Sequence, residues 1–185
     1  MLPNVGRGRP RVYCSPSCRV RAHRHRNVMP PEMTARPRWV RWRLWKRDGR
    51  VTKLPIQVTG TMASSTDPGT WSTYGEALAS SAGTGLGFML GDGIGCIDLD
   101  HCIDDDGNLS ELARDVLAMC PPTFVEISQS GRGLHIFGLM PEAPGRNRGG
   151  VEVYSKARFI AMTGNRHKGS PSVLADLAEI RSMLI

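Results

Sequence analysis

The sequence of 185 residues predicts an α+β fold built mostly from antiparallel strands. Three observations indicate this fold. Short segments of alternating apolar and polar residues recur along the chain, Gly-rich turns separate them, and only three stretches have a helical pattern. The composition, 40% hydrophobic and 22% charged, suits one globular domain with some additional sequence.

The N-terminal part begins with a segment too poor in apolar residues to fold alone. We predict a basic, flexible arm over residues 1–36, with residues 29–33 as its linker, and a folded body over residues 37–185. Residues 38–45 alternate as a strand, and the Asp48–Gly49 turn leads into a partner strand over residues 51–58.

The middle of the chain carries the first helix signal and a predicted hairpin. Thr73 and Glu76 have the spacing of a capping box, which predicts a short helix through Ser80. Residues 86–90 and 94–99 are predicted to pair around a turn at residues 91–93.

The C-terminal half predicts two more hairpins and two more helices. Asn108 and Glu111 mark the start of a helix that runs through Met119. The hairpins are predicted to pair residues 123–128 with 134–139 and residues 151–154 with 158–163. A last helix is predicted from one apolar face: Val173, Leu177, Ile180 and Leu184.

Charge is distributed unevenly along the chain. Residues 1–53 hold 15 of the 24 Lys and Arg residues but only 2 of the 17 Asp and Glu residues. A basic segment joined to a mildly acidic body predicts a polyanionic partner, most simply nucleic acid. The alternative is a basic tail that only aids solubility.

Cysteine usage and hydropathy indicate the compartment. Five cysteines, an odd number spread along the chain, argue against a disulfide framework. No apolar stretch reaches the ~18 residues of a membrane span, and the N-terminus lacks the apolar core of a signal peptide. We therefore expect a cytoplasmic protein with no membrane partner.

Strand periodicity predicts that several polar side chains share one sheet face. If the strands that contain Asp98, His135 and Glu152 belong to one sheet, these side chains and Asp100 lie on the face opposite the core. Clustered carboxylates repel one another and form an oxygen-ligand site suited to Mg²⁺ or Mn²⁺. The alternatives are a surface acidic pair and a histidine that belongs to the core.

The loop before His135 has the composition of a phosphate site. Residues 128–133 offer backbone N–H groups, the Ser130 hydroxyl and the Arg132 guanidinium. The two glycines of this loop, Gly131 and Gly133, are equally compatible with a simple turn.

Taken in order, residues 93–100, 123–136 and 151–164 resemble the primase-polymerase domain of the archaeo-eukaryotic primase superfamily, especially its phage and plasmid members. The resemblance covers residues 38–166 and implies an RRM-like antiparallel sheet with a small accompanying α/β unit. It implies that Asp98, Asp100 and Glu152 are catalytic and hold Mg²⁺ or Mn²⁺. The nucleotide-binding residues that it implies are Ser130, Arg132, His135, Arg158 and Lys53.

The N-terminal arm resembles half of a small zinc motif. Cys14 and Cys18 have the spacing of two thiolate ligands, with His23 or His25 as further candidates, but a second Cys pair is absent. We favour a basic arm without zinc.

The function predicted from these features is DNA priming and polymerisation: template-dependent nucleotidyl transfer from an NTP or dNTP by a two-metal mechanism. The expected partners are a single-stranded DNA template, nucleotides and a separate replicative helicase, in the replication of a phage, plasmid or integrated element. Two alternatives remain: a catalytically silent nucleic-acid-binding module or truncated primase remnant, and a metal-dependent nuclease.

Overall fold

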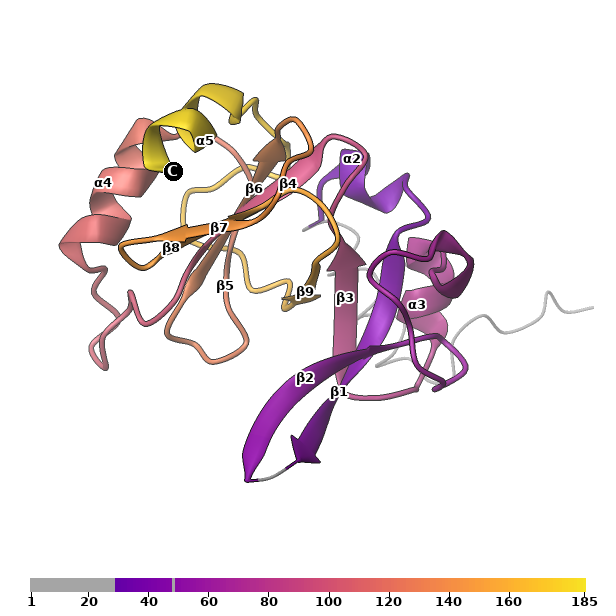
Figure 1. The fold of residues 1–185 in the computed structure, drawn as a ribbon. Coiled ribbons are helices and arrows are strands. Elements are labelled where there is room, and N and C mark those ends of the chain that lie inside the picture. The colour runs from indigo at the N-terminus through magenta and orange to yellow at the C-terminus, as the bar shows by residue number, and fades with distance from the viewer. Residues whose placement is uncertain (1–28, 48) are drawn as a thin grey trace, which may run out of the picture.

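Two antiparallel sheets pack against each other (Figure 1), as a computed structural model of residues 29–47 and 49–185 shows. The first sheet has the order β2-β1-β3-β9 and the second has the order β5-β6-β4-β8-β7. The α+β class and the mostly antiparallel pairing are confirmed. The strands of the four-stranded sheet are β1 (Trp39–Arg47), β2 (Arg50–Ile56), β3 (Gly85–Met89) and β9 (Phe159–Met162).

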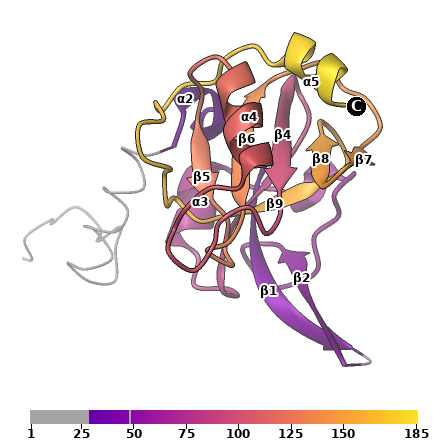
Figure 2. The same ribbon diagram turned by 90° about the vertical axis from the view of Figure 1, so that its left-hand side faces the viewer.

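The five-stranded sheet is covered by helices on one face and by the other sheet on the opposite face (Figure 2). Its strands are β4 (Ile94–Leu99), β5 (Val125–Ile127), β6 (Leu134–Leu139), β7 (Arg146–Arg148) and β8 (Val151–Tyr154). The covering helices are α4 (Glu111–Met119) and α5 (Ala178–Leu184), which pack through Val116 and Ile180. None of the helices described is both long and apolar enough to cross a lipid bilayer.

The core between the two sheets is centred on Trp39. Its ring lies 4.7 Å from the ring of Tyr74 and 5.1 Å from that of Phe88, and its Nε1 donates a 2.9 Å hydrogen bond to the carbonyl of Met33. The five-stranded sheet contributes Cys96 and Phe137 to the same cluster. Both faces of the five-stranded sheet are therefore apolar over much of their area.

Two predicted hairpins are wrong, because the chain changes sheets at their turns. After β3 the chain passes through residues 91–93 into β4 of the other sheet, with Asp92 at φ 54°. After β8 it returns to β9 of the four-stranded sheet. The β1–β2 and β5–β6 hairpins are confirmed.

The helix predictions hold with shifted ends. Helix α3 (Tyr74–Ala79) begins with the predicted capping box of Thr73 and Glu76, and a 3₁₀ turn (Pro68–Thr70) precedes it. Helix α4 is capped by Ser110 instead of Asn108, whose backbone and side-chain N–H groups bind Asp104. Helix α5 begins after Leu177, so Val173 lies outside it and is exposed.

The expected linker over residues 29–33 is wrong. Pro31 begins a short helix, α2 (Pro31–Thr34), at the position where proline is favoured. Met29 and Met33 are buried in the core between the sheets, with Met33 fully inaccessible. The residues that bury these methionines come from distant parts of the chain, so the composition of residues 29–33 alone does not predict their burial.

Met33→Ala is expected to lower the free energy of unfolding by about 2 kcal/mol, because it leaves a cavity beside Trp39. Urea unfolding followed by circular dichroism measures the change. Met62→Ala is the matched control: Met62 is 53% exposed, and its truncation is expected to cost less than about 0.5 kcal/mol. Equal effects of the two substitutions would contradict the packing of α2.

Candidate active site

Five polar residues form one line across the five-stranded sheet. In the strand register Glu126 lies opposite His135, His135 opposite Asp98, Asp98 opposite Glu152, and Glu152 opposite Asn147. Directly opposed residues of antiparallel strands project from the same face. We call Glu126, His135, Asp98, Glu152 and Asn147 the polar row.

The polar row lies on the face that the sheet turns toward the four-stranded sheet. Cys96, two residues before Asp98 on β4, and Phe137, two residues after His135 on β6, belong to the core between the sheets. The sequence predicted that Asp98, His135 and Glu152 share a face, and this is confirmed. The sequence also predicted that this face lies opposite the core, and this is wrong: the face packs against the core between the two sheets, and the polar row lies at the border of that core.

His135 lies between two carboxylates. Its Nδ1 is 3.0 Å from Oε1 of Glu126, and its Nε2 is 3.8 Å from Oδ1 of Asp98. The His135 side chain is almost entirely buried. Because the Glu126 carboxylate accepts a hydrogen bond, it favours a proton on Nδ1 of His135. The other ring nitrogen, Nε2, faces Asp98.

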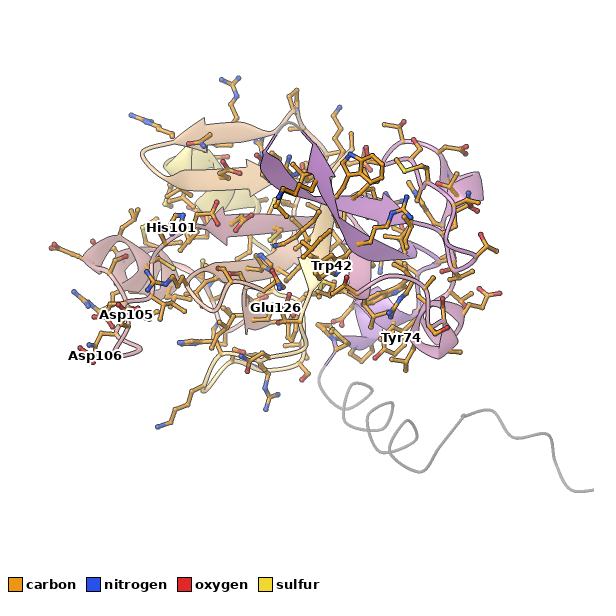
Figure 3. All side chains as sticks on the ribbon, turned by 90° about the horizontal axis from the view of Figure 1, so that it is seen from below. Trp42, Tyr74, His101, Asp105, Asp106 and Glu126 are labelled. Carbon is orange, nitrogen blue, oxygen red and sulfur yellow. The ribbon has the colours of Figure 1, made fainter. Side chains whose placement is uncertain are left out.

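Glu126 belongs to the polar row but was not among the site residues predicted from the sequence. It is fully buried, and its carboxylate also accepts hydrogen bonds from the backbone N–H groups of Thr163 and Gly164, at 3.1 Å and 2.9 Å. These two residues directly follow β9, a strand of the other sheet. Figure 3 shows Glu126 near the middle of the molecule. A charged residue within the apolar strand at residues 125–127 was the available signal.

Asp98 carries an unsatisfied buried oxygen. Its Oδ1 is inaccessible to solvent and makes no hydrogen bond within the described residues. Burial raises the pKa of the Asp98 carboxyl; His135 opposes this shift, whereas the Asp100 and Glu152 carboxylates add to it. A buried acceptor of this kind, next to further carboxylates, fits a cation ligand.

Glu152 is held on the other side of Asp98. It accepts 2.7 Å hydrogen bonds from Asn147 Nδ2 and from the hydroxyl of Tyr154, and the Arg158 guanidinium is 4.0 Å away. Arg158 also stacks on the Tyr154 ring at 4.5 Å. Burial raises the pKa of the Tyr154 hydroxyl, which keeps it a hydrogen-bond donor to Glu152. The structure thus places Arg158 beside the polar row.

The three predicted metal ligands are not equally placed. Asp98 and Glu152 are direct register partners, whereas Asp100 follows the end of β4 and is exposed. Within residues 29–47 and 49–185, no three acidic, His or Cys side chains converge as a ready metal-binding group. Joint coordination by the three carboxylates therefore requires their side chains to turn toward one another.

The predicted phosphate loop connects β5 to β6. The hydroxyls of Ser128 and Ser130 are 3.0 Å apart, and Ser130 Oγ accepts a hydrogen bond from the backbone N–H of Arg132. The Arg132 side chain forms an ion pair with Asp105, an exposed residue at the edge of the molecule in Figure 3. Ser130 and Arg132 are both exposed on this loop, at the end of the strand that carries His135.

The remaining predicted residues lie apart from the polar row. Lys53 is exposed on β2 of the four-stranded sheet, with its ammonium 5.9 Å from the Trp42 ring centre. Cys14 and Cys18 lie outside the described residues, and so does the predicted zinc site.

The fold and the polar row define a two-sheet α+β domain with a buried carboxylate–histidine–carboxylate line on the inner face of one sheet. No protein-family model matches the chain. The chain is 34% identical over 170 aligned residues to the DNA primase-polymerase of Nitratiruptor phage NrS-1. The match covers 80% of this chain but only 23% of the phage protein, so the chain spans less than a quarter of that relative. This similarity supports the predicted relationship to primase-polymerases.

Proposed function

We propose that this chain carries the nucleotidyl-transfer site of a DNA primase-polymerase. The observation that carries the proposal is the register of β4, in which Asp98 lies directly opposite both His135 and Glu152. The similarity to part of a phage primase-polymerase supports it. In the proposed reaction a 3′-hydroxyl attacks the α-phosphate of an NTP or dNTP, a P–O bond forms, and pyrophosphate leaves.

Each side chain has a proposed role. Asp98, Asp100 and Glu152 would hold Mg²⁺ or Mn²⁺, which supplies charge neutralisation at the phosphates and lowers the pKa of the attacking hydroxyl. His135 binds the phosphates of the incoming nucleotide by donating an Nε2–H, so that both ring nitrogens carry a proton when the nucleotide is bound. Glu126 fixes the orientation of the His135 ring. Arg158, beside Glu152, provides a further positive charge for the nucleotide, and Ser130, Arg132 and Lys53 are proposed as outer contacts.

The proposed biological setting follows from the similarity to the phage protein. Priming or extension on single-stranded DNA would serve the replication of a phage, plasmid or integrated element. A separate replicative helicase is the proposed partner in this setting.

The test is nucleotide incorporation on single-stranded DNA, with and without a primer, in the presence of Mg²⁺ or Mn²⁺. Wild type is expected to make extended products, and the Asp98→Ala/Asp100→Ala double variant none. A chelator is expected to reproduce the effect of the double substitution. Glu179→Ala, which removes a carboxylate from α5 on the other side of the sheet, is the control and is expected to keep full activity.

Three results would contradict the proposal. Shortened DNA in place of extended DNA would indicate a nuclease. Equal DNA binding by wild type and the double variant, without nucleotide incorporation by either, would indicate a silent binding module. Incorporation that survives the double substitution would show that the polar row is not the reaction site.

A further inference from the structure

The distal part of the β1–β2 hairpin projects beyond the sheet to which it belongs. β1 pairs with β3 only over residues 39–42, whereas its pairing with β2 continues from Arg41 to Arg47. Residues 43–47 therefore pair only with residues 50–54. Figures 1 and 2 both show this part extending away from the rest of the molecule. We call residues 43–54 the ribbon tip.

The ribbon tip is strongly basic. Its 12 residues include five of the 24 Lys and Arg residues of the chain and a single acidic residue, Asp48. Such a density of positive charge on a narrow two-stranded element selects a polyanion, whose phosphates attract several cations at once.

The ribbon tip also exposes large apolar side chains. Trp45 is 45% exposed, and Leu44 and Val51 on the opposite face are more than half exposed. The Arg43 guanidinium lies 5.6 Å from the centre of the Trp45 ring. An exposed indole beside a guanidinium offers a base-stacking surface and a positive charge for a phosphate in one place.

Strand alternation gives Arg43 and Trp45 one face of the hairpin, which they share with Trp39 and Arg41. Near the sheet this face is covered by α3, because the Tyr74 ring contacts Trp39 and Arg41 Nε donates a 2.7 Å hydrogen bond to the Ala82 carbonyl just after the helix. Further along the hairpin, Trp45 is exposed on this face.

We infer that the ribbon tip binds single-stranded DNA, with a base stacked on Trp45 and a phosphate held by Arg43. The inference rests on the proposed function insofar as it takes this strand to be the template. A single strand fits better than a duplex because its bases are available for stacking on an aromatic ring.

The binding test uses the full chain and a fluorescein-labelled oligodeoxythymidine, followed by fluorescence anisotropy without nucleotides. Trp45→Ala is expected to raise the Kd at least about fivefold, and Trp45→Phe to restore most of the affinity. Leu44→Ala is the matched control, because it truncates an exposed apolar side chain on the opposite face, and its Kd is expected to stay within about twofold of wild type.

Salt dependence separates stacking from charge. Arg43→Gln is expected to reduce the slope of log K against log salt by about one, whereas the effect of Trp45→Ala is expected to persist at elevated salt. Lys168→Gln makes the same charge change on another exposed part of the chain and is expected to leave the slope unchanged. A Trp45→Ala variant with wild-type Kd at all salt concentrations would overturn the inference. So would equal affinity for a duplex of the same length.

The same variants distinguish this inference from the proposed function. Weakened DNA binding by Trp45→Ala in a protein that never incorporates nucleotides would support the ribbon tip and refute the proposed polymerase. Active incorporation with an unchanged Kd and template KM in Trp45→Ala would refute the ribbon tip alone.

Discussion

Asp98→Asn is expected to stabilise the fold at neutral pH while it abolishes catalysis. Burial raises the pKa of the Asp98 carboxyl above its ordinary value of 3.8, so the folded protein holds the ionised form at a cost in free energy. Asparagine keeps the shape of the side chain and removes the charge. The expected gain is a higher free energy of unfolding in the absence of divalent cations, measured by urea unfolding.

The pH dependence of this gain follows from the direction of the shift. An acid whose pKa is raised on folding binds its proton more tightly in the folded state, so wild type loses stability as pH rises from 3.8 through the raised value. The advantage of Asp98→Asn is therefore expected to be full above that range and to vanish below it. Asp115→Asn on α4 is the control: Asp115 is exposed, and its substitution is expected to change stability by less than about 0.5 kcal/mol at any pH.

Divalent cations are expected to reverse the order of stability. Mg²⁺ or Mn²⁺ that binds the folded wild type raises its Tm by mass action, and Asp98→Asn loses this response together with at least about 100-fold in nucleotide incorporation. A variant that is less stable than wild type at neutral pH without cations, or that retains the cation-dependent rise in Tm, would contradict the proposed role of Asp98.

Glu126→Gln is expected to lower the incorporation rate by about 10- to 100-fold. Glu126 is not a proposed metal ligand, and we expect it to act through its contact with His135. The carboxylate has two oxygens for three donors: the His135 ring and the N–H groups of Thr163 and Gly164. A glutamine has one acceptor oxygen and turns an NH₂ group toward one of these donors. His135 then loses its acceptor at Nδ1 or the backbone segment after β9 loses its anchor.

The readout that identifies positioning is the tautomer of His135. In wild type labelled with ¹⁵N-histidine, the NMR shifts of His135 are expected to show a protonated Nδ1, and Glu126→Gln is expected to change this pattern in a protein that is still folded. The kinetic effect is expected partly in the KM for nucleotide, because His135 is the proposed phosphate contact.

The control for Glu126→Gln is Glu142→Gln. Glu142 is also a carboxylate that accepts a backbone hydrogen bond, from Asp92, but it is exposed and lies outside the strands that carry the polar row. Its substitution is expected to leave incorporation unchanged. Wild-type kinetics and an unaltered His135 tautomer in Glu126→Gln would show that Glu126 is only a core residue.

The sequence predicted local features well because they depend on neighbouring residues. The capping box of Thr73 and Glu76 and the alternation that places Asp98 with His135 are both present. Sheet membership could not be predicted in the same way. The turn at residues 91–93 has the composition of a hairpin turn, yet it carries the chain from one sheet into the other.

The positions of Glu126 and Met33 could not be predicted for the same physical reason. The pairing of Glu126 with His135 depends on strand register, and its contacts with Thr163 and Gly164 depend on a strand of the other sheet. The burial of Met33 depends on a core assembled from segments far apart in the chain. None of these relationships has a period or a spacing that can be read along the sequence.

The two crossings between the sheets have a consequence for synthesis and folding. The four-stranded sheet joins residues 39–56 and 85–89 to residues 159–162, and the backbone groups that anchor Glu126 come from residues 163 and 164. A nascent chain on the ribosome therefore has neither a complete four-stranded sheet nor an anchored Glu126 until nearly all of these residues have emerged. Long-range pairing of this kind slows folding and makes it cooperative. Products that terminate before residue 163 are therefore expected to lack an assembled polar row, and with it nucleotide incorporation.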